Sequence, residues 1–401
     1  MHKNMSRIFA ALACLAVIPA VAFASSSRLQ GMNVPGDYVK DYTGIFTYVS
    51  GVGSVGNLVY VEPGNFTNDN GMGAILGNLW EGRLGTWGVN LRRFSPTLGQ
   101  AFSSDPLTTS FDFNGSGLGS DPNSNGEAFD LLWGHKMGTG SLGLRLNRSF
   151  ISHEVTAGTA EGNGNGGRNV WGLGAGFGFA MNSNTDVEVS ALFQNRSFKG
   201  TDINTPSTAA DDGGSTYMIS ARAMKKAAGN LTLTPVVKYY KFDLSSTTAA
   251  NVATDDQLSG WQVGLAGNWA LASDDLFVLG AQFVGNKRET TVGTGPTTTD
   301  SETYYPNVFM ALETHTNSWL TLRFGAQNAM MYSAKNESGA PAVTVTDKAH
   351  TFSYSIGATV KAGSMAFDAV MNPLFYNNPV GATFNNGLGI PFTRVSATYS
   401  F

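Results

Sequence analysis

The sequence predicts an all-β protein that forms a transmembrane antiparallel up-and-down β-barrel of about 16 strands. Three observations lead to this fold class: charged residues are scarce, apolar and polar residues alternate along most of the chain, and short connections alternate with long ones. Charged residues make up 13% of the chain, about half the share found in soluble globular proteins. No run after residue 24 is long and apolar enough for a membrane-spanning helix, and a membrane barrel needs only one apolar face per strand.

Residues 1–24 have the pattern of a secretory signal peptide. Lys3 and Arg7 precede an apolar stretch over residues 8–23, and Ala22-Phe23-Ala24 matches a small-residue cleavage site. Cys14, the single cysteine, lies inside this stretch, so the mature chain is expected to lack disulfides. We expect this segment to be cleaved and the rest of the chain to be exported to the bacterial outer membrane.

Alternation with period 2 marks the individual strands. In residues 258–271, for example, Trp261, Val263, Leu265 and Trp269 share one face, whereas Gln262 and the other polar or small residues share the opposite face. The pattern predicts sixteen strands, with fourteen as the alternative because the first two are the least regular. The predicted strands cover residues 57–63, 71–80, 84–94, 126–137, 139–154, 168–181, 185–198, 214–226, 230–243, 258–271, 275–288, 303–314, 318–331, 350–361, 364–376 and 392–401.

The connections between these strands alternate in length, which is typical of outer-membrane barrels with short periplasmic turns and long external loops. The short turns are residues 138–140, 182–184, 228–229, 273–274, 316–317 and 362–363. The long connections are residues 95–125, 155–167, 199–213, 244–257, 289–302, 332–349 and 377–391, and they are rich in Ser, Thr, Asn, Asp and Gly. An even number of strands places both ends of the barrel on the periplasmic side.

A run of alternating glycines, "VWGLGAGFGFAM", occupies residues 170–181. A dinucleotide-binding loop requires the spacing G-x-G-x-x-G followed by a helix, whereas this run keeps strict alternation and is followed by a turn and another strand. We therefore expect the glycines to line the lumen, where they leave room for something to pack closely against the wall. This lumen glycine face consists of Gly172, Gly174, Gly176 and Gly178.

The same parity places charged and polar side chains inside the barrel. An arginine at the midplane of the lipid-facing side costs about 2–4 kcal/mol, so the mid-strand residues Arg145, Arg222 and Arg323 are expected to point inward. Their positive charge predicts a lumen that favours anions, with partial compensation by Glu188 and Asp368. The lumen-lining candidates are Arg92, Arg145, Glu188, Arg196, Arg222, Lys238, Gln282, Arg323 and Asp368.

One external loop contains a weak candidate for a Ca²⁺ site. Asp121, Asn123 and Asn125 match the first half of an EF-hand loop, but Leu132 stands where that loop needs a bidentate glutamate. A looser Ca²⁺ site or an ordinary Asn/Gly turn are the two interpretations. No cofactor is otherwise expected. No motif joins the histidines to a nucleophile, so we expect no enzyme, and the net charge of −4 gives no reason to expect nucleic-acid binding.

The last strand alternates Val395, Ala397, Tyr399 and Phe401 with polar residues. This ending resembles the C-terminal strand of bacterial outer-membrane barrels, and the resemblance implies recognition by the barrel-assembly machinery through Phe401. Contacts with outer-membrane lipid and lipopolysaccharide are expected around the barrel.

Residues 25–56 precede the regular strands and contain Arg28, Gly31-Met32, Asp37 and Phe46 in that order. This order resembles the opening of FadL-like and PorV-like outer-membrane proteins, although Val49-Ser50-Gly51 stands where that group has Asn-Pro-Ala. In that group the N-terminal stretch folds into the lumen as a plug, and the resemblance implies the same here. A periplasmic segment outside the barrel is the alternative. The predicted division is thus 1–24, 25–56 and a barrel over 57–401.

Passive, porin-like passage of small solutes through an outer-membrane channel is the function that the sequence predicts. The alternatives are FadL-like uptake of hydrophobic molecules through a plugged barrel, and a non-transport role as a PorV-like partner platform or an adhesin. The pattern identifies neither the solute nor the oligomeric state.

Overall fold

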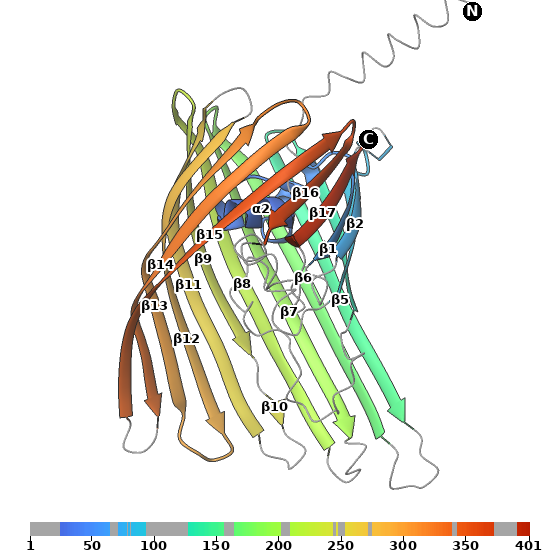
Figure 1. Ribbon diagram of the computed structural model, residues 1–401. Helices are drawn as coiled ribbons and strands as arrows, with labels where there is room; N and C mark the ends of the chain where they lie inside the picture. Colours follow the sequence, from blue (N-terminus) through green and yellow to red (C-terminus); the bar gives the residue numbers. More distant parts are fainter. Residues whose placement is uncertain are drawn as a thin grey trace, which may run out of the picture.

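The chain forms a closed antiparallel β-barrel whose lumen holds short helices from the N-terminal segment (Figure 1). A computed structural model describes residues 25–64, 71–77, 79–80, 82–93, 127–155, 164–201, 209–243, 246–247, 253–271, 275–338, 343–372 and 391–401. Among these residues, none of the helices has the length and apolar character that crossing a membrane requires.

Seventeen strands make a single sheet, and one of them, β10, is a two-residue segment beside the ends of β8 and β11. The other sixteen form the wall, so the predicted fold class and strand number are confirmed. The strands are β1 (Leu58–Gly64), β2 (Gly71–Leu76), β3 (Thr86–Arg93), β4 (Glu127–Met137), β5 (Gly140–Val155), β6 (Gly164–Asn182), β7 (Thr185–Thr201), β8 (Ala209–Ala228), β9 (Leu231–Asp243), β10 (Ser246–Thr247), β11 (Ala253–Ala270), β12 (Leu276–Val292), β13 (Thr298–His315), β14 (Leu320–Ser338), β15 (Val343–Ala362), β16 (Met365–Met371) and β17 (Phe392–Ser400).

Closure comes from the pairing of the first and last strands. β1 pairs with β2 on one side and with β17 on the other, with Leu58 opposite Ser400 and Val61 opposite Ala397. All of the neighbouring strands are antiparallel. The pairing of β15 with β16 covers only Gly357–Ala362, so in the described part of the chain the rest of β15 is paired with β14 alone. A closed sheet satisfies its backbone hydrogen bonds internally, which is the condition for crossing lipid with strands.

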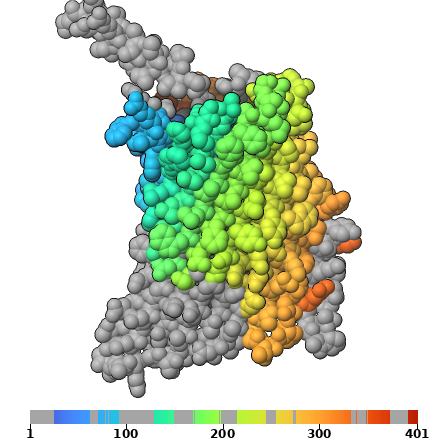
Figure 2. All heavy atoms as spheres, turned by 180° about the vertical axis from the view of Figure 1, so that it is seen from behind, coloured from blue at the N-terminus to red at the C-terminus, as the bar shows by residue number. Residues whose placement is uncertain are grey.

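The alternation seen in the sequence becomes an apolar outer face and a mixed inner face. On β11, the outward side chains of Trp261, Val263 and Leu265 are 43%, 45% and 50% exposed. On the same strand Ala266 and the glycine Gly264 face the lumen, where Gly264 meets the Tyr38 hydroxyl of the N-terminal segment. Figure 2 shows the outer wall from β5 to β12 from outside.

Several strands run further toward the long-connection end than predicted. β12 continues to Val292 and β13 begins at Thr298, so the predicted connection 289–302 shrinks to residues 293–297. β14 and β15 likewise pair from Ser338 and Val343, inside the predicted connection 332–349. The predicted lengths of these connections are therefore wrong. Polar Thr-, Ser- and Asp-rich sequence does not stop backbone pairing, so the strands continue beyond the apolar band.

The N-terminal segment folds into four short helices, α2 (Ser26–Met32), η1 (Gly36–Tyr38), η2 (Tyr42–Phe46) and η3 (Val49–Ser54). Ser25 caps α2 by accepting a hydrogen bond from the backbone N–H of Arg28, and Asp41 caps η2 by accepting one from Gly44. Residues 25–54 lie inside the barrel, at the end nearer the C-terminus in Figure 1. We call residues 25–54 the lumen segment.

Candidate functional site: the closed lumen

The candidate functional site is the contact between the lumen segment and the inner wall. The segment crosses the barrel: α2 contacts β13 to β17, η1 contacts β9, and η3 contacts β3 to β7. Three groups of buried polar side chains and one apolar layer join the segment to the wall.

The first group, which we call the α2 latch, consists of Arg28, Glu313, Arg323, Asp368 and Ser25. The Arg28 guanidinium donates to both carboxylate oxygens of Glu313, at 2.7 and 2.6 Å. Arg323 donates to the same carboxylate at 2.5 Å and to Asp368 at 3.0 Å. Ser25 donates to the second Asp368 oxygen at 2.8 Å. The α2 latch thus ties the first turn of α2 to β13, β14 and β16.

A second group surrounds η1. The Lys238 ammonium lies 2.5 Å from the Asp37 carboxylate. Arg222 donates to the backbone carbonyl of Asp37 at 3.0 Å and to the Glu188 carboxylate at 2.6 Å. The same guanidinium lies over the Tyr48 ring, 4.0 Å from its centroid. Two cations from β8 and β9 therefore hold residues of the lumen segment by charge, hydrogen bond and ring contact.

The third group centres on Asp130 and Arg145, whose side chains are fully buried and lie 2.7 Å apart. Asn90 and Asn147 each donate to the Asp130 carboxylate at 2.9 Å. Arg145 also donates to the backbone carbonyl of Phe46 at 2.8 Å. An ion pair between two strands of the wall is thus connected to the lumen segment by a direct hydrogen bond from Arg145.

The pKa values of Asp41 and Arg28 in the lumen segment are both raised, for different reasons. For Asp41, burial raises the pKa above its ordinary value, although the Arg28 charge and hydrogen bonds from Thr43 and Gly44 act in the opposite direction. For Arg28, burial disfavours the charged form, but the charge and hydrogen bonds of Glu313 outweigh it, so the pKa of Arg28 is raised. Arg28 therefore stays charged while it is buried, and Glu313 is the reason.

The glycines of the wall form the seat of η3. A Cβ on Gly143 would overlap the carbonyl group of Val49, and one on Gly176 would lie 2.7 Å from the backbone nitrogen of Ser50. Gly178 faces the Ser50 side chain in the same way. The alternating glycines of β6 therefore allow the η3 backbone to lie directly on the wall, because no side chain separates the two backbones at these positions.

A second seat lies beneath the end of α2. A Cβ on Gly325 would overlap the carbonyl group of Met32, and a Cβ on Gly357 would lie 2.9 Å from the Cα atom of Gly31. Backbone packs on backbone at both ends of the lumen segment, so neither end can shift without losing close contacts.

The structure describes the side chains of seven of the nine lumen-lining candidates, and all seven are buried. Arg145, Glu188, Arg222, Lys238, Arg323 and Asp368 belong to the three groups above, and Gln282 accepts a hydrogen bond from Gln262 at 3.0 Å. The side chains of Arg92 and Arg196 lie outside the described residues. Asp121, Asn123 and Asn125 of the Ca²⁺ candidate also fall outside them, and the described residues contain no acidic, histidine or cysteine cluster of metal-site size.

The parity argument missed the acidic partners Asp37, Asp130 and Glu313. Asp130 and Glu313 have the inward parity of their strands, and Asp130 pairs across the sheet with Asn147. This signal was available in the sequence, but no strand pattern predicts which acid meets which base. The partners balance the charge: the described ion pairs of the three groups join Arg28, Arg145, Arg222, Lys238 and Arg323 to Asp37, Asp130, Glu188, Glu313 and Asp368. The surplus of positive charge that predicted anion preference is therefore absent from these groups.

Removing one partner of the Asp130–Arg145 pair is expected to destabilise the barrel strongly. Arg145→Met leaves Asp130 buried without its cation and should lower the free energy of unfolding by about 3–5 kcal/mol. The double variant Arg145→Met/Asp130→Leu should recover most of this loss, because no uncompensated charge remains. Urea unfolding in detergent micelles, followed by tryptophan fluorescence, measures both. Equal loss in the single and double variants would contradict the assigned role of the ion pair.

An apolar layer packs between the wall and the lumen segment next to these groups. On β8, Met218 is the next inward residue after Ser220 in the direction of the long connections. On β9, Tyr240 and Phe242 are the next two inward residues after Lys238 in the same direction. The Tyr240 and Phe242 rings lie 5.5 Å apart. We call this set the apolar layer; its wall residues are Leu132, Leu192, Met218, Tyr240, Phe242 and Leu258, which cluster with Tyr42, Ile45, Phe46, Val49 and Val52 of the lumen segment.

Comparison with solved structures gives distant likenesses to outer-membrane proteins. A FadL homologue from Pseudomonas aeruginosa is 11% identical, with a TM-score of 0.43 over 94% of this chain and 98% of that chain. CdiB from Escherichia coli is 10% identical, with a TM-score of 0.42 over 86% of this chain. BauA, the ferric preacinetobactin receptor from Acinetobacter baumannii, is 10% identical, with a TM-score of 0.46 over 78% of this chain.

The chain spans 62% of the length of CdiB and 53% of the length of BauA. No protein-family model and no curated protein matches the sequence.

Proposed function

We propose that this protein is an outer-membrane transport barrel whose lumen segment closes the passage and which admits small hydrophobic or amphipathic molecules. The observation that supports it is the fixation of residues 25–54 across the lumen by three groups of buried ion pairs and two glycine seats. In an open aqueous pore these charged groups would face water instead of one another. The proposal includes export by the signal peptide 1–24, assembly through Phe401 and no enzymatic activity.

The apolar layer supports the substrate class. The wall residues Met218, Tyr240 and Leu258 are 2%, 7% and 5% exposed and form one apolar cluster with residues of the lumen segment, so displacement of the segment would uncover aliphatic and aromatic surface. Ligand sites are commonly lined by such surface with a few polar groups for orientation. The polar groups within this layer are the Tyr240 hydroxyl and the Asn286 side chain, to which the hydroxyl donates at 2.5 Å. A molecule with an apolar body and a small polar end fits this lining better than a hydrated ion does.

Single-channel recording of the refolded mature protein in a planar bilayer tests the proposal. We expect no steady conductance from the full chain and steady steps from a variant that lacks residues 27–54, with heat-modifiable gel migration as the control for folding. Steady nanosiemens-scale steps from the full chain would contradict the proposal and favour the porin-like alternative. If the deletion variant does not fold, binding of a dansyl-labelled fatty acid by the full chain provides the second measurement, and absence of binding would count against the substrate class.

A further inference from the structure

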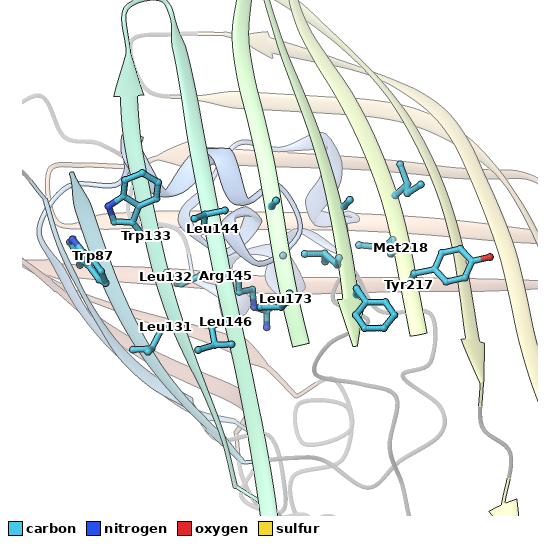
Figure 3. Close-up of a pocket in the computed structure, with 16 residues that line it drawn as sticks. Trp87, Leu131, Leu132, Trp133, Leu144, Arg145, Leu146, Leu173, Tyr217 and Met218 are labelled. Carbon is cyan, nitrogen blue, oxygen red and sulfur yellow. The ribbon is translucent and has the colours of Figure 1, made fainter. Parts of the chain in front are cut away.

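The outer wall formed by β4 to β8 carries a hollow of about 720 Å³ (Figure 3). It opens toward lipid, because the side chains of Leu144, Leu173, Phe193 and Ile219, which surround it, are 45%, 60%, 46% and 53% exposed. Trp87 and Trp133 lie at the end near the short turns, and both indole N–H groups donate to the Leu84 carbonyl. The volume falls in the range of small-ligand sites, roughly 300–1,000 Å³.

Two facing alanines create the hollow. Ala175 on β6 pairs directly with Ala191 on β7, and both have the outward parity of their strands. Leu144 on β5 pairs with Ala175 on one side, and Ile219 on β8 pairs with Ala191 on the other. Because two alanine methyl groups lie between the longer side chains of Leu144 and Ile219, the outer surface of the wall is recessed at this point. The hollow is therefore built by the sequence and does not depend on a loop.

A cation lies directly above the hollow toward the long-connection end. Arg148 is the next outward residue after Leu146 on β5 and pairs with Trp171 on β6. Its guanidinium lies 4.3 Å from the Trp171 ring centroid and donates to Asn169 at 2.6 Å. Arg148 lies eight residues beyond Gly140, which is roughly 20 Å along the membrane normal at the usual rise and tilt. With Gly140 at the short-turn edge of an apolar band of about 25 Å, Arg148 lies near the opposite edge of that band.

We propose that this wall is a binding site for a phosphate-bearing, multiply acylated glycolipid of the outer leaflet, the class to which lipid A belongs. One acyl chain fills the hollow over Ala175 and Ala191, and a headgroup phosphate meets the Arg148 guanidinium, which Trp171 holds in place. Arginine is suited to this role because its planar fork binds phosphate while it stacks on an aromatic ring. Lys241 has the outward parity of β9, beside Tyr217, and adds positive charge on the far side of the site.

Charge favours this occupant over a second copy of the chain. A two-fold partner packed on the same wall, with its axis along the membrane normal, would bring two Arg148 side chains to the same depth. Like charges facing each other at a contact oppose association. An anionic headgroup with an apolar tail instead matches both parts of the site, the cation above and the hollow below.

Native mass spectrometry of the full chain, extracted in detergent and incubated with purified lipid A, tests the site. We expect Arg148→Gln and Ala191→Phe each to lower lipid A retention about tenfold, the first by removing the cation and the second by filling the hollow; tenfold corresponds to about 1.4 kcal/mol. Ala281→Phe is the matched control, because Ala281 has outward parity on β12, away from the hollow. Lipid A from which the phosphates have been removed should bind wild type as weakly as lipid A binds Arg148→Gln.

Three outcomes would overturn the proposal. Equal retention of phosphorylated and dephosphorylated lipid would show that Arg148 does not read the headgroup. An equal effect of Ala191→Phe and Ala281→Phe would show that the hollow is not a site. A change from dimer to monomer in Ala191→Phe would identify a second copy as the occupant. Retention is measured without transport, so this test can fail or succeed independently of the proposed closed-lumen function.

Discussion

Replacing Glu313 by alanine is expected to release α2 from the wall. Glu313 is the carboxylate that both Arg28 and Arg323 share, and its side chain is only 3% exposed. Its removal leaves two buried guanidinium groups with Asp368 as their remaining carboxylate in the α2 latch, which should cost about 3–5 kcal/mol. Since 1.4 kcal/mol is a factor of ten, the population of the released segment should rise by about a hundredfold or more.

The measurement is the rate at which a water-soluble maleimide labels Ser27→Cys in the refolded mature chain. Ser27 is buried, and Cys14, the only natural cysteine, lies in the predicted signal peptide. The matched control is Glu289→Ala, which removes an exposed ion pair with Lys287 and should change stability by no more than about 1 kcal/mol. Similar labelling rates in the two variants would mean that the α2 latch does not hold the segment.

Replacing Gly143 by valine is expected to displace η3. The new Cβ would overlap the Val49 carbonyl group, which is backbone and cannot move aside as a flexible side chain would. The cost should reach or exceed the upper end of the roughly 1–3 kcal/mol typical of overpacking. Either η3 leaves its seat or the barrel assembles poorly, and both follow from the same clash.

Maleimide labelling of Ser50→Cys detects the displacement, because Ser50 is 1% exposed when η3 is seated. Gly56→Ala is the control, since a Cβ there meets no atom within 4 Å. Heat-modifiable migration separates an assembled barrel without seated η3 from one that has not assembled. An assembled Gly143→Val barrel in which Ser50→Cys remains protected would contradict the seat.

Much of the fold was open to prediction because membrane strands obey a strict local rule. The apolar side of each strand must face lipid, so alternation alone located sixteen strands and gave Arg145, Arg222 and Arg323 their inward parity. Strand ends were harder to predict, as β13 and β15 show, because pairing beyond the apolar band depends on the neighbouring strand and not on hydrophobicity.

The closed lumen depends on contacts that no local pattern contains. Arg28 and Glu313 are 285 positions apart in the chain, and Lys238 and Asp37 are 201 positions apart. The glycines of β6 signalled that something would lie close to the wall, yet the spacing could not identify η3 as the element that does so. Only the three-dimensional structure shows which acid of the wall pairs with Arg28 of the segment and which base of the wall pairs with Asp37 of the segment.

The lumen segment is fixed at both ends to nearly opposite walls, α2 on β13 to β17 and η3 on β3 to β7. In mechanical terms it is a tie rod across a thin-walled cylinder. Because backbone packs on backbone at both ends, the rod opposes a change of the barrel's width along its own direction as long as both ends hold. Freeing one end removes this brace, and the shape of the cylinder and the position of the rod then change together.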